Sequence, residues 1–196
     1  MVQSKRYWEA YYIAGHGYAM ARGWYRQDDY PTNAVLYNNP TAARYQAWLR
    51  SVGVQYVLLQ AGTLDFTSEA EAGLLRSGRS GLRLVARTGS WSVYALPNPT
   101  PIVTPAGAAR VTKITPTTIT IEATRPVALT VRVHDTPYWT AQSADGSACV
   151  AAGTGSSTPL AVRHAGTVEL RFVIRPASVV RALLGTRTAC APVTTP

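Results

Sequence analysis

A proline-rich segment near the middle of the chain constrains its fold more than any other sequence feature. Four prolines fall within residues 97–105. Proline fixes φ and lacks a backbone N–H, so this segment is unsuited to a helix or to the interior of a sheet. All tryptophans and tyrosines except Tyr138 and Trp139 precede it. The expected organisation is therefore a first domain at 1–97, a linker at 98–108 and a second domain at 109–196.

Helix and strand patterns alternate in the first domain. Tyr45, Trp48 and Leu49 recur at helical spacing. Asn39-Pro40 is typical of a helix start, with Asn as N-cap, and Ser68 with Glu71 has the spacing of a capping box. The expected elements are helices at 7–14, 39–53 and following Ser68, a buried strand at 54–59, and a hairpin of 82–87 with 91–96.

Period-two alternation replaces these patterns after the linker. Strands are expected at 111–114, 119–121, 127–133 and 168–172, with one or two helical turns at 177–184. Several short strands separated by turns favour an antiparallel sandwich. The predicted fold class is α+β, with a small α/β domain followed by a jelly-roll or Ig-like β-sandwich.

Both cysteines, Cys149 and Cys190, lie in the second domain within polar segments. A disulfide between them would close a loop of about forty residues and stabilise the domain by about 3–4 kcal/mol. It would also indicate an oxidising compartment. The alternative is a pair of unrelated thiols.

The charge of +9 is dispersed, with ten basic and six acidic residues over 1–97 and nine basic and four acidic residues over 98–196. A nucleic-acid-binding protein would gather this charge in a stripe, so we expect no nucleic-acid partner. Attraction to anionic lipid headgroups or lipid-linked phosphates remains open. The longest apolar run, 52–59, is too short for a membrane helix, and the chain starts without the apolar stretch of a signal peptide. We therefore expect a soluble fragment whose export signal lies outside this sequence.

Aromatic, arginine and carboxylate side chains are densest at 7–12 and 21–30. Sugars stack on aromatic rings and bind planar polar groups, so these residue types indicate a glycan site. A structural brace is nevertheless the first interpretation of this cluster, with Arg22 and Arg26 lying over aromatic rings and pairing with Asp28 or Glu9, and the glycan contact comes second. An acid–base pair of Glu9 and Asp28 is the third interpretation. The candidate ligand-binding residues are Trp8, Arg22, Trp24, Arg26, Asp28, Tyr138 and Trp139.

Other catalytic signatures are missing from the sequence. Residues 153–157 are glycine-rich but lack the lysine and the following helix of a phosphate-binding loop. The three histidines lie far apart and beside no second ligand at metal spacing. We therefore expect no metal and no cofactor, and we do not expect this fragment to be an enzyme.

Four runs occur in a recognisable order: Tyr7-Trp8-Glu9-Ala10, Arg22 to Asp28, Tyr45 to Val57, and Pro137-Tyr138-Trp139. This order resembles the C-terminal extracytoplasmic region of large actinobacterial polytopic membrane proteins, which look like membrane glycosyltransferases of the GT-C type that use lipid-phosphate sugar donors.

The resemblance implies a place on the outer face of the bacterial plasma membrane, beside the protein's own transmembrane region. In such transferases the catalytic acidic residues lie near the first membrane helices, so no catalytic residue is carried over to this chain. The C-terminal domains of related arabinosyltransferases bind carbohydrate. The expected function is therefore non-catalytic recognition of a cell-wall glycan or lipid-linked sugar that assists a membrane glycosyltransferase. A purely structural domain that packs on the membrane portion is the alternative, followed by a carboxylate-dependent glycan-active enzyme.

Overall fold

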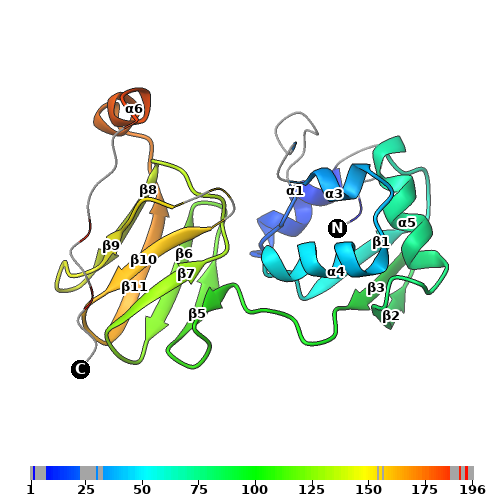
Figure 1. The fold of residues 1–196 in the computed structure, drawn as a ribbon, viewed down its shortest axis with the longest axis horizontal. Coiled ribbons are helices and arrows are strands. Elements are labelled where there is room, and N and C mark those ends of the chain that lie inside the picture. Colours follow the sequence, from blue (N-terminus) through cyan, green and yellow to red (C-terminus); the bar gives the residue numbers. More distant parts are fainter. Residues whose placement is uncertain are drawn as a thin grey trace. The chain divides into compact units, whose positions relative to one another are not determined.

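The computed structural model describes residues 2, 8–22, 30, 33–153, 155, 157–185, 190 and 193. The chain divides into two compact units, Met1–His16 with Met20–Pro101, and Gly17–Ala19 with Ile102–Pro196 (Figure 1). Eleven strands in three sheets lie within the described residues, and the neighbouring strands pair antiparallel. The protein is therefore rich in β structure.

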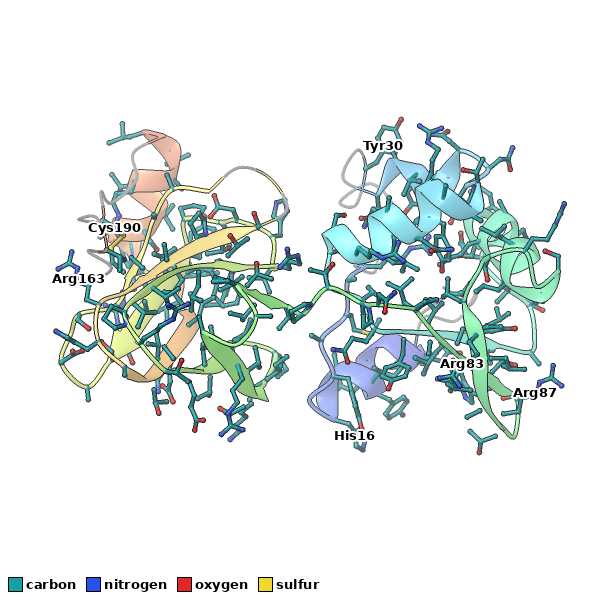
Figure 2. The ribbon with its side chains drawn as sticks, turned by 60° about the horizontal axis from the view of Figure 1, so that its bottom comes forward. His16, Tyr30, Arg83, Arg87, Arg163 and Cys190 are labelled. Atoms are coloured by element: carbon teal, nitrogen blue, oxygen red, sulfur yellow. A yellow bond between two sulfur atoms is a disulfide. The ribbon has the colours of Figure 1, made fainter. Side chains whose placement is uncertain are left out.

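The first unit contains a three-stranded sheet in the order β1-β3-β2. The hairpin of β2 and β3 turns at Gly89, whose φ of 54° suits glycine. β2 is an exposed edge strand, and its Arg83 and Arg87 extend into solvent (Figure 2), which discourages pairing with other chains. The elements of this unit are α1 (Trp8–Gly15), α3 (Ala34–Tyr37), α4 (Ala42–Ser51), β1 (Tyr56–Gln60), η1 (Phe66–Ser68), α5 (Glu69–Arg76), β2 (Arg83–Thr88) and β3 (Trp91–Ala95).

The start of α4 differs from the prediction. Thr41, not Asn39, is the N-cap, and its hydroxyl accepts a hydrogen bond from the backbone N–H of Arg44 at 3.4 Å. Asn39 has a φ of 48°, in the left-handed region, whereas an N-cap needs extended backbone. The helix therefore begins two residues later than Asn39 suggested.

The core of the first unit lies between the helices and the sheet. Tyr45 and Leu49 from α4, Leu75 from α5, and Val57 and Leu59 from β1 are all buried in one cluster. Residues four apart share one helix face, which is why the helical spacing of Tyr45 and Leu49 did predict an inward face. Val2 also joins this cluster, and its N–H donates to the carbonyl of Leu58 at 2.8 Å.

The second unit contains two four-stranded sheets, in the orders β4-β7-β10-β9 and β5-β6-β11-β8. In β7 and β6, buried and more exposed positions alternate along the strand, as the period-two pattern predicted. The elements are β4 (Val103–Thr104), β5 (Ala109–Ile114), β6 (Thr118–Ala123), β7 (Val127–Val131), β8 (Trp139–Ser143), β9 (Cys149–Val150), β10 (Thr158–Val162), β11 (Gly166–Phe172) and α6 (Pro176–Leu183).

Both sheets of this unit contribute to a single hydrophobic core. Ile121 and Leu170 come from one sheet, and Leu129 and Leu160 from the other. Part of the expected linker belongs to this unit, because β4 starts at Val103 and pairs with β7.

The predicted disulfide between Cys149 and Cys190 is confirmed, with a Cα–Cα distance of 5.8 Å (Figure 2). It ties the segment that follows α6 to strand β9. Among the described residues, no helix combines the length and apolar character needed to cross a bilayer.

Candidate functional site

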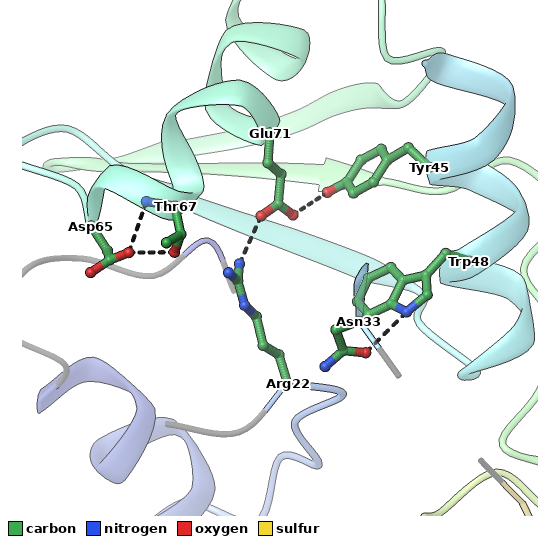
Figure 3. A network of polar contacts seen from close by, with 7 residues as sticks. All are labelled: Arg22, Asn33, Tyr45, Trp48, Asp65, Thr67 and Glu71. Atoms are coloured by element: carbon green, nitrogen blue, oxygen red, sulfur yellow. Dashed lines mark hydrogen bonds and ion pairs between the residues drawn. The ribbon is translucent and has the colours of Figure 1, made fainter. Parts of the chain in front are cut away.

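A buried ion pair joins two distant parts of the first unit (Figure 3). Arg22 Nη1 donates to Glu71 Oε2 at 2.9 Å, and the two side chains are only 3% and 4% exposed. The guanidinium carbon of Arg22 also lies 5.4 Å from the ring centroid of Tyr37 on α3, in cation–π contact. Because a buried charge is tolerated only with partners, this geometry fixes the segment at Arg22 to α5 and α3.

Tyr45 completes the network from α4. Its hydroxyl donates to Glu71 Oε1 at 2.6 Å, so both carboxylate oxygens of Glu71 are bound. Burial raises the pKa of Tyr45 well above its usual value, the negative charge of Glu71 adds to this rise, and Arg22 opposes it. Tyr45 therefore acts here as a neutral hydrogen-bond donor.

The role of Arg22 as a brace was one of the expected interpretations, and the partners of Arg22 that the structure describes are Glu71 and Tyr37. The sequence did not predict these two partners, and the expected pairing of Arg22 with Asp28 or Glu9 stays a prediction. The capping box assigned to Glu71 is wrong, because the side chain of Ser68 makes no capping hydrogen bond and Glu71 points into the core. The available signal was that Glu71 lies four residues before Leu75, which places both residues on the buried face of α5.

The network continues to Trp48 by ring contact. The rings of Tyr45 and Trp48 stack with 6.4 Å between centroids and 13° between planes. Trp48 Nε1 donates to Asn33 Oδ1 at 3.1 Å. Nearby, Asp65 Oδ1 accepts from the N–H of Thr67 at 2.9 Å and caps η1 (Figure 3). The indole of Trp48 is thus held in orientation by both a stacking partner and a hydrogen bond.

Trp48 forms one wall of a pocket of about 340 Å³ between α3 and α4. Asn38 donates through Nδ2 to the carbonyl of Ala34 at 3.0 Å, which leaves its Oδ1 available. Arg44 is exposed at the pocket. The lining residues are Ala34, Val35, Asn38, Pro40, Arg44, Ala47 and Trp48. The described lining residues supply an aromatic face, a guanidinium and an amide, which are groups that suit ligand binding.

Trp8 lies apart from the buried network. It belongs to α1, where it is 64% exposed, and Tyr11 and Tyr12 on the same helix face are also exposed. The rings of Tyr11 and Tyr12 meet edge to face at 5.8 Å. Residues at i, i+3 and i+4 share one side of a helix, so α1 presents a continuous aromatic face.

Tyr138 and Trp139 pack within the second unit. Their rings contact Phe172 of β11 edge to face, with centroid distances of 5.7 Å and 5.5 Å. Trp139 Nε1 also donates to the carbonyl of His134 at 3.1 Å. Both rings are half-buried, so they help to hold β8 against β11.

The remaining candidates Trp24, Arg26 and Asp28 lie outside the described residues. The proposed acid–base pair of Glu9 and Asp28 therefore stays a prediction.

One exposed Asp–His pair was not expected from the sequence. His164 Nδ1 lies 2.5 Å from Asp145 Oδ2. The hydroxyls of Ser143 and Ser147 donate to Asp145 Oδ1 at 2.8 Å and 2.7 Å. The hydrogen bonds from the two serines, more than that from His164, lower the pKa of Asp145. In a nucleophilic triad, a serine would instead donate to the histidine, so this cluster is a turn stabilised by Asp145.

Within the part of the chain that is described, no group of three or more His, Cys, Asp or Glu side chains is arranged to hold a metal ion. Comparison with known protein families, with curated proteins and with solved structures finds no match for this chain.

Proposed function

We propose that this chain is a non-catalytic recognition module whose ligand is a glycan or a glycosylated acceptor, bound in the pocket between α3 and α4. The observation that carries the proposal is the fixed indole of Trp48 beside the exposed guanidinium of Arg44 in one pocket. A volume of about 340 Å³ falls within the range of small-ligand sites.

Each lining group has a role in such binding. The apolar C–H face of a sugar ring would stack on Trp48, since aromatic rings offer large and rigid contact areas. Arg44 would donate paired hydrogen bonds to adjacent hydroxyls or to a phosphate. The free carbonyl oxygen of Asn38 would accept from a hydroxyl.

The buried network supports this site by preorganising it. Glu71 holds Tyr45, and Tyr45 stacks on Trp48. A ligand therefore meets a pocket wall that is already ordered, which avoids the entropic cost of fixing side chains on binding.

The wider setting of the proposal is the outer face of a bacterial plasma membrane, where this chain would assist a membrane glycosyltransferase. The sequence resemblance supports this setting, and the disulfide is compatible with it. We also infer that the first unit is a small α/β domain, and that the two sheets of the second unit form a β-sandwich, because both of those sheets share one core.

Calorimetric titration with arabinan, galactan and mannan fragments tests the pocket. We expect one fragment class to bind, and Arg44→Gln to weaken it about tenfold, as expected for the loss of a charged hydrogen bond. Arg83→Gln on exposed strand β2 is the matched control and should bind like the parent. The proposal fails if no fragment binds at millimolar concentration, or if both variants lose affinity equally.

A structural domain that packs on the membrane portion of a longer protein is the second candidate. The exposed aromatic face of α1 favours it, because Trp8, Tyr11 and Tyr12 would be buried by such packing. Hydrogen exchange in α1 should then be slower in the longer protein than in this chain. Equal exchange rates would remove this candidate.

A further inference from the structure

Helix α6 presents its larger apolar side chains to solvent. Leu183 is 83% exposed and Leu184 71% exposed, and Val180 on the same side is also exposed. The inward side of the helix carries Ser178, which is buried, and Val179 and Ala182, which are half-buried. Val180 and Leu183 therefore lie outside the stripe of α6 that packs on its own protein.

The first turn of α6 is capped by its own residues. Ser178 accepts the N–H of Arg175 at 2.9 Å and donates to the carbonyl of Arg175 at 2.7 Å, which anchors the first turn. Beyond the helix, the disulfide from Cys190 to Cys149 ties the chain back to β9. α6 is therefore a capped helix of the second unit that exposes Val180 and Leu183.

Two exposed arginines border this face. Residues 170–196 contain four arginines and no aspartate or glutamate. Arg175, at the N-cap, and Arg181, within α6, have exposed side chains. Ile174, directly before Arg175, is a further exposed apolar residue at 65%. An apolar face bordered by arginines matches a lipid surface, where the alkyl groups enter the acyl boundary and the guanidinium groups meet anionic headgroups.

We propose that α6 docks this protein on an anionic lipid bilayer, with Ile174, Val180, Leu183 and Leu184 inserted and Arg175 and Arg181 at the headgroups. The contact is peripheral, because α6 has only eight residues and lies in the plane of the interface. The charge of this face favours a membrane over a second copy of the chain as its partner. Two copies of the same arginine-bordered face would bring like charges together, whereas an anionic membrane neutralises them.

Vesicle flotation with the 196-residue chain tests this docking. Vesicles of phosphatidylcholine alone are compared with vesicles that also contain phosphatidylglycerol, each at low and at high salt. We expect binding to the anionic vesicles only, weakened by salt. Leu183→Glu/Leu184→Glu should lower binding at least tenfold, and Arg175→Gln should lower it about fivefold.

Phe66→Glu is the matched control, since Phe66 is 78% exposed in the first unit and lies outside α6. It should bind vesicles like the parent chain, and circular dichroism should show all variants folded. Three results would overturn the proposal: no binding to anionic vesicles at low salt, binding that survives Leu183→Glu/Leu184→Glu, or sedimentation showing a dimer that the same double substitution abolishes.

Discussion

At the scale of single residues, Glu71 decides how the first unit is held together. Its carboxylate bonds Arg22 and Tyr45, which approach from segments 49 and 26 residues away in the chain. A buried ion pair adds little net stability compared with an apolar pair of the same size, but losing one member leaves the other charge buried. Substituting Glu71 should therefore be more damaging than its position on a helix suggests.

We predict that Glu71→Gln lowers the free energy of unfolding by about 3–5 kcal/mol, because the buried guanidinium of Arg22 keeps its charge and loses the charged carboxylate of Glu71. Urea denaturation followed by circular dichroism measures the change. Glu69→Gln is the control on the same helix, since Glu69 is exposed and lies 3.8 Å from Arg76, and it should change stability by no more than about 0.5 kcal/mol. Similar losses in the two variants would contradict the buried role of Glu71.

Tyr45 predicts a dependence of stability on alkaline pH. Its pKa is raised in the folded state by burial and by Glu71, so the unfolded chain releases this proton at lower pH than the folded chain does. The contribution is complete below the ordinary tyrosine pKa of about 10 and is lost as pH rises above it. The melting temperature should therefore fall less between neutral pH and pH of about 11 in Tyr45→Phe than in the parent. Parallel pH curves would rule this out.

At the scale of elements, helix α4 begins at a different residue from the one that the local sequence pattern predicts. Asn39-Pro40 has the composition of a helix start, but Asn39 adopts a φ of 48° and Thr41 supplies the cap. N-cap preference shows which residue types can cap a helix. The backbone conformation of the segment before the helix then determines which of those residues becomes the cap.

We predict that Thr41→Ala destabilises the first unit by about 1 kcal/mol and that Thr41→Ser restores most of the loss, because serine keeps the hydroxyl acceptor. Asn39→Gly should be neutral or stabilising, since glycine accepts a positive φ more readily than asparagine. Thermal melts of the three variants check both statements, and a larger loss from Asn39→Gly than from Thr41→Ala would reverse the assignment of the cap.

In the second unit, strands with a regular alternation of apolar and polar residues were predicted from the sequence, and strands without it were not. β7 was predicted because Val127, Leu129 and Val131 alternate with other side chains. β10 was not, because Pro159 argues against a strand; in the structure its carbonyl accepts the N–H of Ala151 at 3.0 Å. The two-residue strand β9 is too short to leave a periodic signal. Such elements exist because neighbouring strands offer them hydrogen bonds.

At the scale of the whole molecule, two separate cores imply two unfolding events. One core gathers residues from 2 to 96 and the other residues from 103 to 170. The disulfide lies entirely in the second unit.

We predict that calorimetry shows two transitions and that Cys149→Ser/Cys190→Ser lowers only one of them. On the chain-entropy model, a loop of 41 residues is stabilised by about 3–4 kcal/mol. The first unit lacks cysteine, so its transition should not move. Equal shifts in both transitions, or no shift in either, would contradict independent cores.

The sequence by itself determined the position of the proline-rich division, the alternation of side chains in most strands, the inward face of α4 and the cysteine pair. Each of these features can be read from residues close together in the chain, because hydrophobic periodicity, proline geometry and the number of cysteines are local properties of the sequence. Tertiary structure decided the partner of Arg22, the role of Glu71, the fixed orientation of Trp48 and the outward face of α6. Each of these features depends on contacts between segments that are distant in the chain. Local residue patterns do not show which buried charges will pair, or which face of a helix will pack against the rest of the protein.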